Sequence, residues 1–473
     1  MKKTRLAIVI PPVVMHTFRD PGMKHSLPHI GIAYLASNVD TQRTEVIILD
    51  CPVEHIKIEK LIANLEQFSP DVVGFTASTF QINEAAIAAD AVKKSMPTVT
   101  TLIGGYHVTP SPVETMERYP SFDIAVVGEG EQTLKQLLEY LPDSKCLSSI
   151  DGICYRNGGE IKMNPPRALN QNLDNLAFPA FHLMPMEKYK GMYILMLRKN
   201  RGITVSTARG CPYQCTFCYR ITGSNYRTRS IPSVAEEIKR NISDFKIDQI
   251  VIIDESFTIN RQRTYEFCEQ LLNAGIPKKI GWVCASRVDL VDQEILKRMK
   301  EAGCELIVYG IESGNQDILN KIKKNARLET AIEAIRLTKQ AGIKTFASFI
   351  FGLPYETKQT IQDTINFAMK IDPDLVSFSK LTPFPGTAVA EMAKKGVGGL
   401  KLLTNDYTRY GRTIGVALEL EQLPLKELDK YHRLAYLRFY MRPSKFYGFF
   451  LIADIMLVLL MIWHTLASIF KRK

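Results

Sequence analysis

Arg209-Gly-Cys-Pro-Tyr-Gln-Cys-Thr-Phe-Cys-Tyr219 places three cysteines, Cys211, Cys215 and Cys218, in one short run of this 473-residue chain. Soft thiolates select zinc or iron–sulfur clusters over hard cations. A structural zinc site needs four closed ligands, but no fourth Cys or His follows at zinc-ribbon spacing and the other six cysteines are scattered singly. Three thiolates on a [4Fe–4S] cluster leave one iron open for a substrate or cofactor.

The run resembles the signature of the radical S-adenosylmethionine (SAM) superfamily, which has this spacing and an aromatic residue before the last cysteine, here Phe217. The resemblance implies a [4Fe–4S] cluster on Cys211, Cys215 and Cys218, with SAM at the open iron. The alternatives are a zinc knuckle or three ordinary buried thiols. Spacing, aromatic residue and downstream pattern together favour the cluster.

Composition indicates an ordinary globular protein, with 46% hydrophobic and 23% charged residues and room for two or three domains. The net charge is +11, but no stretch alternates basic with aromatic residues, so we expect no nucleic-acid partner. The apolar run Leu6–Ile10 ends at Pro11-Pro12, and we expect a strand there, with no secretory leader. Free thiols and iron–sulfur chemistry indicate the reducing cytoplasm.

Residues 1–145 alternate short apolar strands with helical patterns, which predicts a doubly wound, Rossmann-like parallel sheet. The expected strands are Leu6–Ile10, Glu45–Leu49, Val72–Thr76, Thr100–Ile103 and Ile124–Val127, and the expected helices are Ile30–Val39, Ile58–Phe68, Asn83–Ser95 and Thr133–Tyr140. Such sheets bind ligands beyond the carboxyl ends of their strands. The candidate binding residues at those ends are Ser78, Gly104, Gly105, Gly128, Glu129 and Gly130.

These strand ends, Gly104-Gly105-Tyr106-His107 and Val127-Gly128-Glu129-Gly130-Glu131, resemble the cobalamin-binding domain fused in front of many radical SAM enzymes. Pro28-His-Ile-Gly-Ile-Ala-Tyr-Leu35 is similar to the first helix of that domain. The resemblance implies bound cobalamin. The Asp-x-His-x-x-Gly motif that supplies an axial histidine is absent, so we expect cobalamin without a histidine ligand from the protein. A degenerate domain that binds no cobalamin is the alternative.

Residues 146–195 form the expected connector, with a hairpin over Asp151–Met163 and a Pro-rich linker. Residues 196–395 resume the alternation and resemble the partial (β/α)6 barrel of the radical SAM superfamily. The expected strands are Ile203–Ser206, Gln249–Ile253, Trp282–Ser286, Leu306–Gly310, Thr345–Phe351 and Leu375–Ser379. The expected helices are Val234–Phe245, Arg261–Ala274, Val291–Ala302, Gln316–Lys321, Leu328–Gln340 and Lys358–Met369.

Polar residues and glycines follow the barrel strands, and their order along the chain resembles that of the SAM-binding residues in the radical SAM family. The resemblance implies contacts to the SAM amino group from Asp254 and Glu255, to its carboxylate from Arg287 beside Ser286, to its ribose from Glu312 and to its adenine near Gly352. An arginine suits a carboxylate because its fork donates two hydrogen bonds. The alternatives are a structural ion pair between Arg287 and Glu312, and a plain turn at Gly352. No catalytic residue is assigned.

The tail divides into a helical region, 396–445, and an apolar segment, 446–470. We expect a helix over Leu423–Met441 and no need of this region for the barrel. Phe446–Phe470 has one charged residue, Asp454, and as a helix would extend about 37 Å. That length predicts a membrane helix, and an in-plane helix or a core helix is the alternative.

We expect an enzyme on the cytoplasmic side of the cell membrane that cleaves SAM to a 5′-deoxyadenosyl radical. The resemblance implies methyl transfer from methylcobalamin to an unactivated carbon, with an electron donor such as flavodoxin or ferredoxin. The tail indicates a hydrophobic small-molecule or lipid substrate. The alternatives are radical cyclisation, as in anaerobic porphyrin cyclases, and a non-catalytic, membrane-tethered cobalamin or redox sensor.

Overall fold

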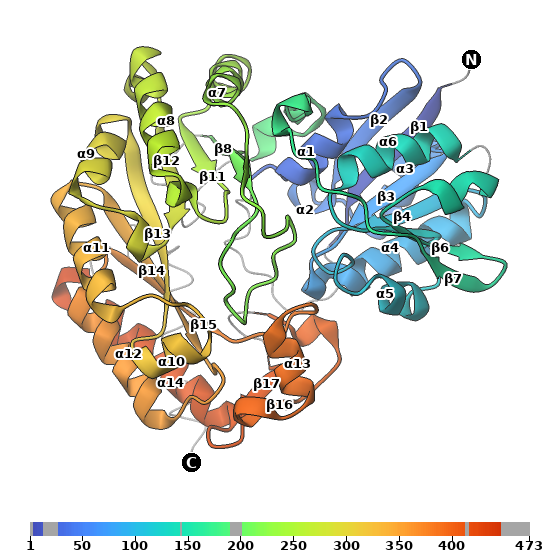
Figure 1. Cartoon of the computed structure of the whole chain (residues 1–473). Helices are drawn as coiled ribbons and strands as arrows, with labels where there is room; N and C mark the ends of the chain where they lie inside the picture. Colours follow the sequence, from blue (N-terminus) through green and yellow to red (C-terminus); the bar gives the residue numbers. More distant parts are fainter. Residues whose placement is uncertain (1–2, 13–26, 142–143, 190–200, 412–415, 446–473) are drawn as a thin grey trace.

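Two α/β units lie side by side in the computed structural model, which describes residues 3–12, 27–141, 144–189, 201–411 and 416–445 (Figure 1). The first unit, in blue and teal, is built on a sheet of five parallel strands extended by an antiparallel hairpin. The second, in green to orange, is an open arc of parallel strands with helices on its outside. The predicted doubly wound domain followed by a partial (β/α)6 barrel is confirmed.

The first sheet has seven strands in the order β2-β1-β3-β4-β5-β6-β7. Its strands are β1 (Thr4–Ile10), β2 (Thr44–Asp50), β3 (Val72–Thr76), β4 (Thr100–Gly104), β5 (Ile124–Val126), β6 (Ile153–Asn157) and β7 (Glu160–Met163). Its helices are α1 (Ile30–Ser37), α2 (Cys51–Glu54), α3 (Ile58–Phe68), α4 (Ile82–Ser95), α5 (Pro112–Arg118) and α6 (Gly130–Tyr140). The five expected parallel strands and four helices are present, and α2 and α5 were not expected.

The predicted hairpin is present as β6 and β7, but it belongs to the first sheet and not to the connector. β6 pairs antiparallel with β5, with Ala125 opposite Cys154. Without this hairpin β5 would be an edge strand with unpaired backbone groups. Cys154 is fully buried in the core on that side. The first domain therefore continues to Met163, past the predicted boundary at residue 145.

The second sheet contains six parallel strands in the order β15-β14-β13-β12-β11-β8, as expected. Its strands are β8 (Gly202–Val205), β11 (Gln249–Ile252), β12 (Gly281–Ser286), β13 (Cys304–Glu312), β14 (Lys344–Phe351) and β15 (Leu375–Lys380). Its helices are α7 (Ile231–Phe245), α8 (Arg261–Asn273), α9 (Gln293–Glu301), α10 (Gln316–Lys321), α11 (Leu328–Gln340) and α12 (Lys358–Ile371). The sequence did not predict α13 (Ala388–Lys394) or the two-stranded ribbon of β9 (Ala208–Arg209) and β10 (Arg227–Thr228).

The C-terminal region contains the two-stranded sheet of β16 (Leu400–Leu402) and β17 (Leu418–Leu420), followed by the expected helix α14 (Leu425–Tyr440). The expectation that the barrel does not need this region was wrong, because α14 covers the edge strand β15. The hydroxyl of Tyr440 accepts from the Val376 N–H at 3.0 Å and donates to the Val376 carbonyl at 2.8 Å.

The predicted membrane helix lies outside the described residues. Within the ranges that the structure describes, no helix combines the length and the apolar character that a membrane span requires.

Candidate functional site

The loop that carries the three cysteines connects the two strands of the ribbon, β9 and β10. Arg209 stands opposite Arg227 in this ribbon, and residues 210–226 form the loop between them. Gly210 has φ +95°, and a Cβ there would lie 2.0 Å from the Asn225 carbonyl oxygen, so only glycine fits. The loop is also tied to the barrel, because the Thr216 N–H donates to the Ile322 carbonyl at 3.0 Å.

The three thiols lie close enough to affect one another electrostatically. Burial raises the pKa of Cys215. Cys218 is the most open of the three to solvent, but crowding by protein, and then the thiols of Cys215 and Cys211, raise its pKa to about 11. Among the described residues, no three His, Cys, Asp or Glu side chains converge as ligands of one metal ion. A cluster binds each thiolate at a different iron, so a set of three separate thiols fits it. Phe217 is partly buried against the barrel core.

Asp254 does not face a ligand, contrary to the expected contact with the SAM amino group. Its carboxylate is buried and accepts from the backbone N–H groups of Thr207 and Ala208, at 2.7 and 3.0 Å. It also accepts from the Thr207 hydroxyl. Burial raises the pKa of Asp254 to about 6, although these hydrogen bonds oppose that shift. Asp254 therefore holds the turn between β8 and β9 in place.

Glu255, the neighbouring candidate, is exposed and so remains able to meet a ligand. It accepts a hydrogen bond from the Thr222 hydroxyl, which in turn accepts from the Gly210 N–H at 3.0 Å. This chain of contacts places a carboxylate directly beside the cysteine loop, where it can accept from an ammonium group.

Arg287 is positioned as a binding residue for an anion. Two of its nitrogens donate to the Asp289 carboxylate at 2.9 and 2.8 Å, and the guanidinium lies 3.7 Å from the ring centre of Tyr213 in the cysteine loop. Its Nη1 is buried without a hydrogen-bond partner among the described residues. A buried donor without a partner is costly, so this nitrogen fits a ligand carboxylate. Ser286 instead bonds within the protein, to Thr258 and to the Arg287 carbonyl.

Glu312 does not pair with Arg287, so that structural alternative was wrong. Its carboxylate accepts from the Lys324 ammonium at 3.1 Å, and both side chains are nearly buried. The charges of Lys324 and Glu312 act in opposite directions on the pKa of Cys215, which places the pair beside the cysteine loop. Glu312 has φ +73°, a left-handed conformation that is uncommon outside glycine.

Gly352 is held in its own turn with φ +86°, where its N–H donates to Glu356 at 2.7 Å.

In the first domain, Gly105 has φ +108°, and a Cβ there would approach the Ala77 carbonyl oxygen to 2.9 Å. Gly128 has φ +82° with open space where a side chain would stand. The remaining candidates there are Ser78, which bonds to Gln81, Gly104 at the end of β4 and Gly130 at the start of α6.

His107 is directed into the protein, although it follows the glycine pair of this edge. It is 1% exposed, its Nδ1 lies 3.4 Å from the Thr79 hydroxyl, and its ring packs 4.5 Å from that of Tyr407. Burial, and then the charge of Arg118, lower its pKa to about 4, so the ring is neutral at pH 7. In this position His107 is part of the contact between the first domain and the C-terminal region.

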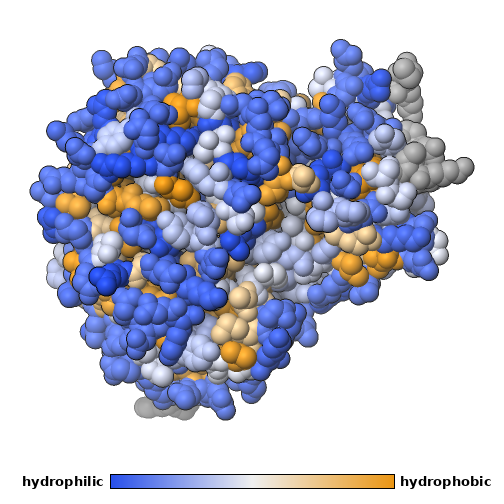
Figure 2. Space-filling view, in the orientation of Figure 1, coloured by the Kyte–Doolittle hydropathy of each residue, from blue (hydrophilic) through white to orange (hydrophobic). Residues whose placement is uncertain are grey.

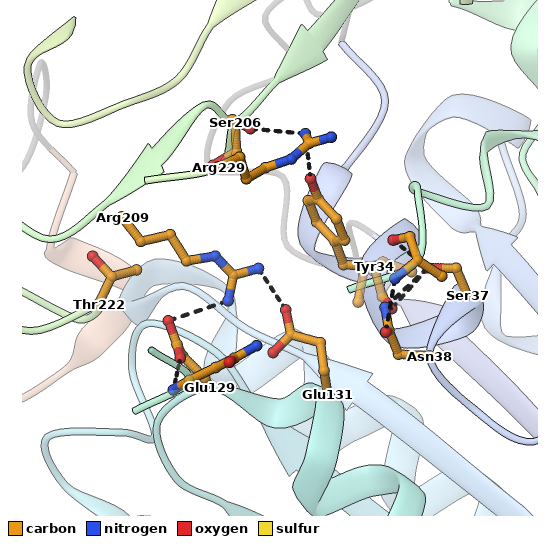
Figure 3. A network of polar contacts seen from close by, with 12 residues as sticks. Tyr34, Ser37, Asn38, Glu129, Glu131, Ser206, Arg209, Thr222 and Arg229 are labelled. Atoms are coloured by element: carbon orange, nitrogen blue, oxygen red, sulfur yellow. Dashed lines mark hydrogen bonds and ion pairs between the residues drawn. The ribbon is translucent and has the colours of Figure 1, made fainter. Parts of the chain in front are cut away.

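Glu129 does not face a ligand, contrary to the cobalamin contact expected from the sequence. Its carboxylate accepts from Arg227 at 2.8 and 3.0 Å and from Arg209 at 3.1 Å, and Figure 3 shows this contact beside that of Glu131 with Arg209. Burial opposes the charge of Glu129, but the hydrogen bonds and charges of the two arginines bring its pKa below the ordinary value. Glu129 is thus a contact between the two domains.

The sequence did not single out Tyr213, Lys324, Arg209 or Arg227. Arg209 and Tyr213 belong to the cysteine stretch itself, so their position was a usable signal. Nothing in the local pattern around Lys324 or Arg227 distinguishes them from surface cations, because their partners are distant in the chain.

Comparison with known proteins gives a match for each domain. Residues 205–368 match the model of the Radical SAM superfamily, and residues 23–138 match that of the B12 binding domain. The chain is 34% identical over 446 residues, 94% of each chain, to an uncharacterized methyltransferase of Pyrococcus horikoshii. It is 30% identical over 432 residues to the anaerobic magnesium-protoporphyrin IX monomethyl ester cyclase of Cereibacter sphaeroides, covering 89% of this chain and 68% of that enzyme.

Two solved structures share the fold of both domains. The radical SAM methyltransferase TsrM from Kitasatospora setae, solved with cobalamin and a [4Fe–4S] cluster, gives a TM-score of 0.73 at 17% identity and covers 94% of this chain and 90% of its own. The cobalamin-dependent SAM radical enzyme OxsB, solved with aqua-cobalamin and SAM, gives 0.73 at 21% identity and covers 92% of this chain and 66% of its own. At these identities the likeness concerns the fold.

Proposed function

This chain belongs to the radical SAM superfamily and carries a B12 binding domain, and we propose that it methylates an unactivated carbon with a [4Fe–4S] cluster, SAM and cobalamin. The observation that carries the proposal is the direct contact between the two candidate sites. Arg209, two residues before Cys211, binds Glu129, which follows the glycine-rich end of β5. The loop for the cluster and the edge for cobalamin therefore meet in one place.

The residues at this meeting point fit the three cofactors. Cys211, Cys215 and Cys218 would hold the cluster, and the buried, unpartnered Nη1 of Arg287 would bind the SAM carboxylate. Glu255 would accept from the SAM amino group. When bound, the cofactors supply a 5′-deoxyadenosyl radical and a transferable methyl group, and the protein positions them. A low-potential donor of the flavodoxin or ferredoxin class would supply the electron.

A hydrophobic substrate is supported by the side chains at the carboxyl edge of the first sheet. Phe80 and Tyr106 follow β3 and β4 and are 45% and 63% exposed. Exposed aromatic side chains beside a glycine-rich edge can pack against an apolar ligand. We propose a hydrophobic small molecule or a lipid, in agreement with the apolar tail of the sequence.

Radical cyclisation is the second candidate, favoured by the 30% identity to the magnesium-protoporphyrin ester cyclase. The two reactions differ in mass balance. Methylation transfers one methyl group from labelled SAM to the product, whereas cyclisation transfers none. The non-catalytic sensor is the weakest alternative, because Arg287 and Glu255 would then have no SAM molecule to bind.

The cluster assignment is tested with a variant in which Cys211, Cys215 and Cys218 are all alanine. Wild-type protein reconstituted under anaerobic conditions should hold about four irons per chain and form 5′-deoxyadenosine upon reduction. The triple variant should do neither. Cys51→Ala, which removes a buried thiol of the first domain, is the matched control and should retain both. Iron binding and SAM cleavage by the triple variant would refute the assignment.

The cobalamin assignment has its own readout. Wild-type protein given hydroxocobalamin should retain it and show the spectrum of a base-off corrinoid, as expected for a domain that lacks the Asp-x-His-x-x-Gly motif. Gly105→Leu should weaken binding, since a side chain there meets the backbone at Ala77. Retention of no corrinoid by the wild type would contradict the methylation proposal and favour a reaction that needs only SAM.

A further inference from the structure

The two arginines of the β9–β10 ribbon form the base of the cysteine loop. Arg209 and Arg227 are directly opposite each other in the antiparallel pairing. The side chains of both reach the same residue of the first domain, Glu129. The ribbon therefore faces the loop that follows β5 with two guanidinium groups, and the cysteines lie on the part of the chain between those groups.

Glu129 and Glu131 both accept from these arginines, and the contacts to Glu129 use both of its carboxylate oxygens. Oε1 of Glu129 accepts from Arg209 at 3.1 Å and from Arg227 at 2.8 Å, and Oε2 accepts from Arg227 at 3.0 Å. Glu131 accepts from Arg209 at 2.6 Å. The four side chains are between 3% and 12% exposed. Buried, paired ions of this kind are directional, because an arginine fork binds a carboxylate in a fixed plane.

One of the two arginines, Arg227, also holds the far end of the loop and the connector. Arg227 donates to the Thr222 carbonyl and to the Asn170 carbonyl, each at 2.6 Å. The Asn170 N–H donates to Glu129 at 3.2 Å. Figure 3 shows Arg209 between Glu129 and Glu131. Tyr34 of α1 lies beside Arg209, and the Tyr34 hydroxyl is in contact with Arg229. One network thus joins the edge of the first domain, the connector and both ends of the cysteine loop.

Movement at the glycine-rich edge would pass directly to the cysteine loop. Gly128, with φ +82°, precedes Glu129 and gives the backbone freedom at that point. On the other side, Gly210 separates Arg209 from Cys211, and the Asn225 carbonyl packs so closely against Gly210 that a Cβ there would lie 2.0 Å from its oxygen. A displacement of Glu129 therefore has to be followed by Arg209 or has to break a buried ion pair, which is costly.

We propose that Glu129, Arg209 and Arg227 couple the two cofactor sites, so that a bound cluster changes the affinity of the first domain for cobalamin. Arg209 is in this view a positioning residue for the cysteine loop. The inference rests on the proposed function, because it takes the loop as the cluster site and the edge as the cobalamin site. Coupling between two binding sites is reciprocal, so cobalamin must change the affinity of the cysteine loop for the cluster by the same factor.

The test measures the Kd for hydroxocobalamin on the full chain, with and without the reconstituted cluster. We expect the wild-type values to differ by about tenfold, within the range typical of coupled sites. Glu129→Gln removes the charge and should bring the ratio of the two Kd values, without and with the cluster, close to one. Arg209→Lys retains the charge without the fork and should give an intermediate ratio. Arg261→Lys, in an exposed ion pair with Asp292 and Glu294, is the matched control and should keep the wild-type ratio.

A spectroscopic readout separates positioning from general loss of structure. Cobalamin should shift the electron paramagnetic resonance of the reduced cluster in the wild type and in Arg261→Lys, but not in Glu129→Gln. If Glu129→Gln does not fold, Glu129→Asp, which keeps the charge but shortens its reach, takes its place. Equal Kd values in the wild type, or a wild-type ratio in the Glu129 and Arg209 variants, would overturn the coupling. Wild-type protein without cluster or cobalamin would instead refute the proposed function.

Discussion

Glu356 is a buried glutamate whose carboxyl group differs from most glutamate side chains in exposure and in pKa. It is 2% exposed, and one carboxylate oxygen accepts from the N–H groups of Gly352 and Leu353 at 2.7 and 3.0 Å. The other oxygen is buried without a partner among the described residues. Burial outweighs the two hydrogen bonds and raises the pKa of Glu356 to about 8. The protonated carboxyl group therefore holds the turn at Gly352 at neutral pH.

This shift predicts a pH-dependent stability. The folded-state pKa of Glu356, about 8, is above the ordinary value of 4.5, so the folded protein binds more protons between these values and loses stability as the pH rises through 8. The loss between pH 6 and pH 8 should be about 2 kcal/mol, from about 1.4 kcal/mol per pKa unit. Glu356→Gln should be less pH-dependent by this amount in urea unfolding. An equal slope in both proteins would show that Glu356 ionises freely.

At the scale of elements, α14 completes the barrel by covering β15. Val376 and Phe378 are two residues apart, so their backbone groups point to the same side of the strand, away from β14. Tyr440 bonds to both backbone groups of Val376 and Tyr436 to both of Phe378, and His432 Nε2 lies 2.8 Å from the Phe378 carbonyl. Three side chains of one helix thus replace the strand that would continue the sheet.

Tyr440→Phe tests this role. The substitution leaves the buried N–H and carbonyl of Val376 without the hydroxyl, and each unpaired buried group costs roughly 1–3 kcal/mol. We expect a loss of at least about 2 kcal/mol in the free energy of unfolding, measured with urea. Tyr431→Phe is the control, because its hydroxyl makes no hydrogen bond to any described residue, and it should change little. Equal stability of the two variants would mean that water replaces the Tyr440 hydroxyl.

At the scale of the whole molecule, the two domains meet at more than the ion network. The Tyr407 hydroxyl donates to Glu114 at 2.6 Å, which ties the C-terminal region to the first domain. A Cβ on Gly386 would lie 2.5 Å from Pro110 and 2.6 Å from Tyr219, so the loop after β15 packs between the first domain and the cysteine loop. On the face shown in Figure 2 the apolar residues form separate small groups on a mostly hydrophilic surface.

We propose that membrane attachment occurs through the apolar tail, residues 446–470. Truncation after Lys445 retains the contacts of that residue with the Pro373 carbonyl at 2.6 Å and with Asp372 at 3.1 Å, so the barrel should stay intact. We expect the full chain to pellet with membranes and the truncated chain to remain in the supernatant, with equal formation of 5′-deoxyadenosine. A full chain that fractionates without membranes, or a truncated chain that unfolds, would contradict the proposal.

The sequence alone determined the features that depend on local order. The spacing of Cys211, Cys215 and Cys218 and the alternation of apolar strands with helices are patterns within a few residues, and they predicted the cluster loop, both parallel sheets and most element bounds. The strand ends also marked Arg287 and Glu312, because parallel strands bring their carboxyl ends to one edge.

Only the tertiary structure decided what these side chains contact. Glu129 and Arg209 are 80 residues apart, and Asp254 and Thr207 are 47 apart, so no local pattern could show that the two acids bind protein and not ligand. For the same reason, the sequence assigned the hairpin to the connector and α14 to a region outside the barrel, although each covers a strand edge whose exposure is a property of the assembled sheet. Periodicity specifies which face of an element is buried, while partners distant in the chain are specified by packing.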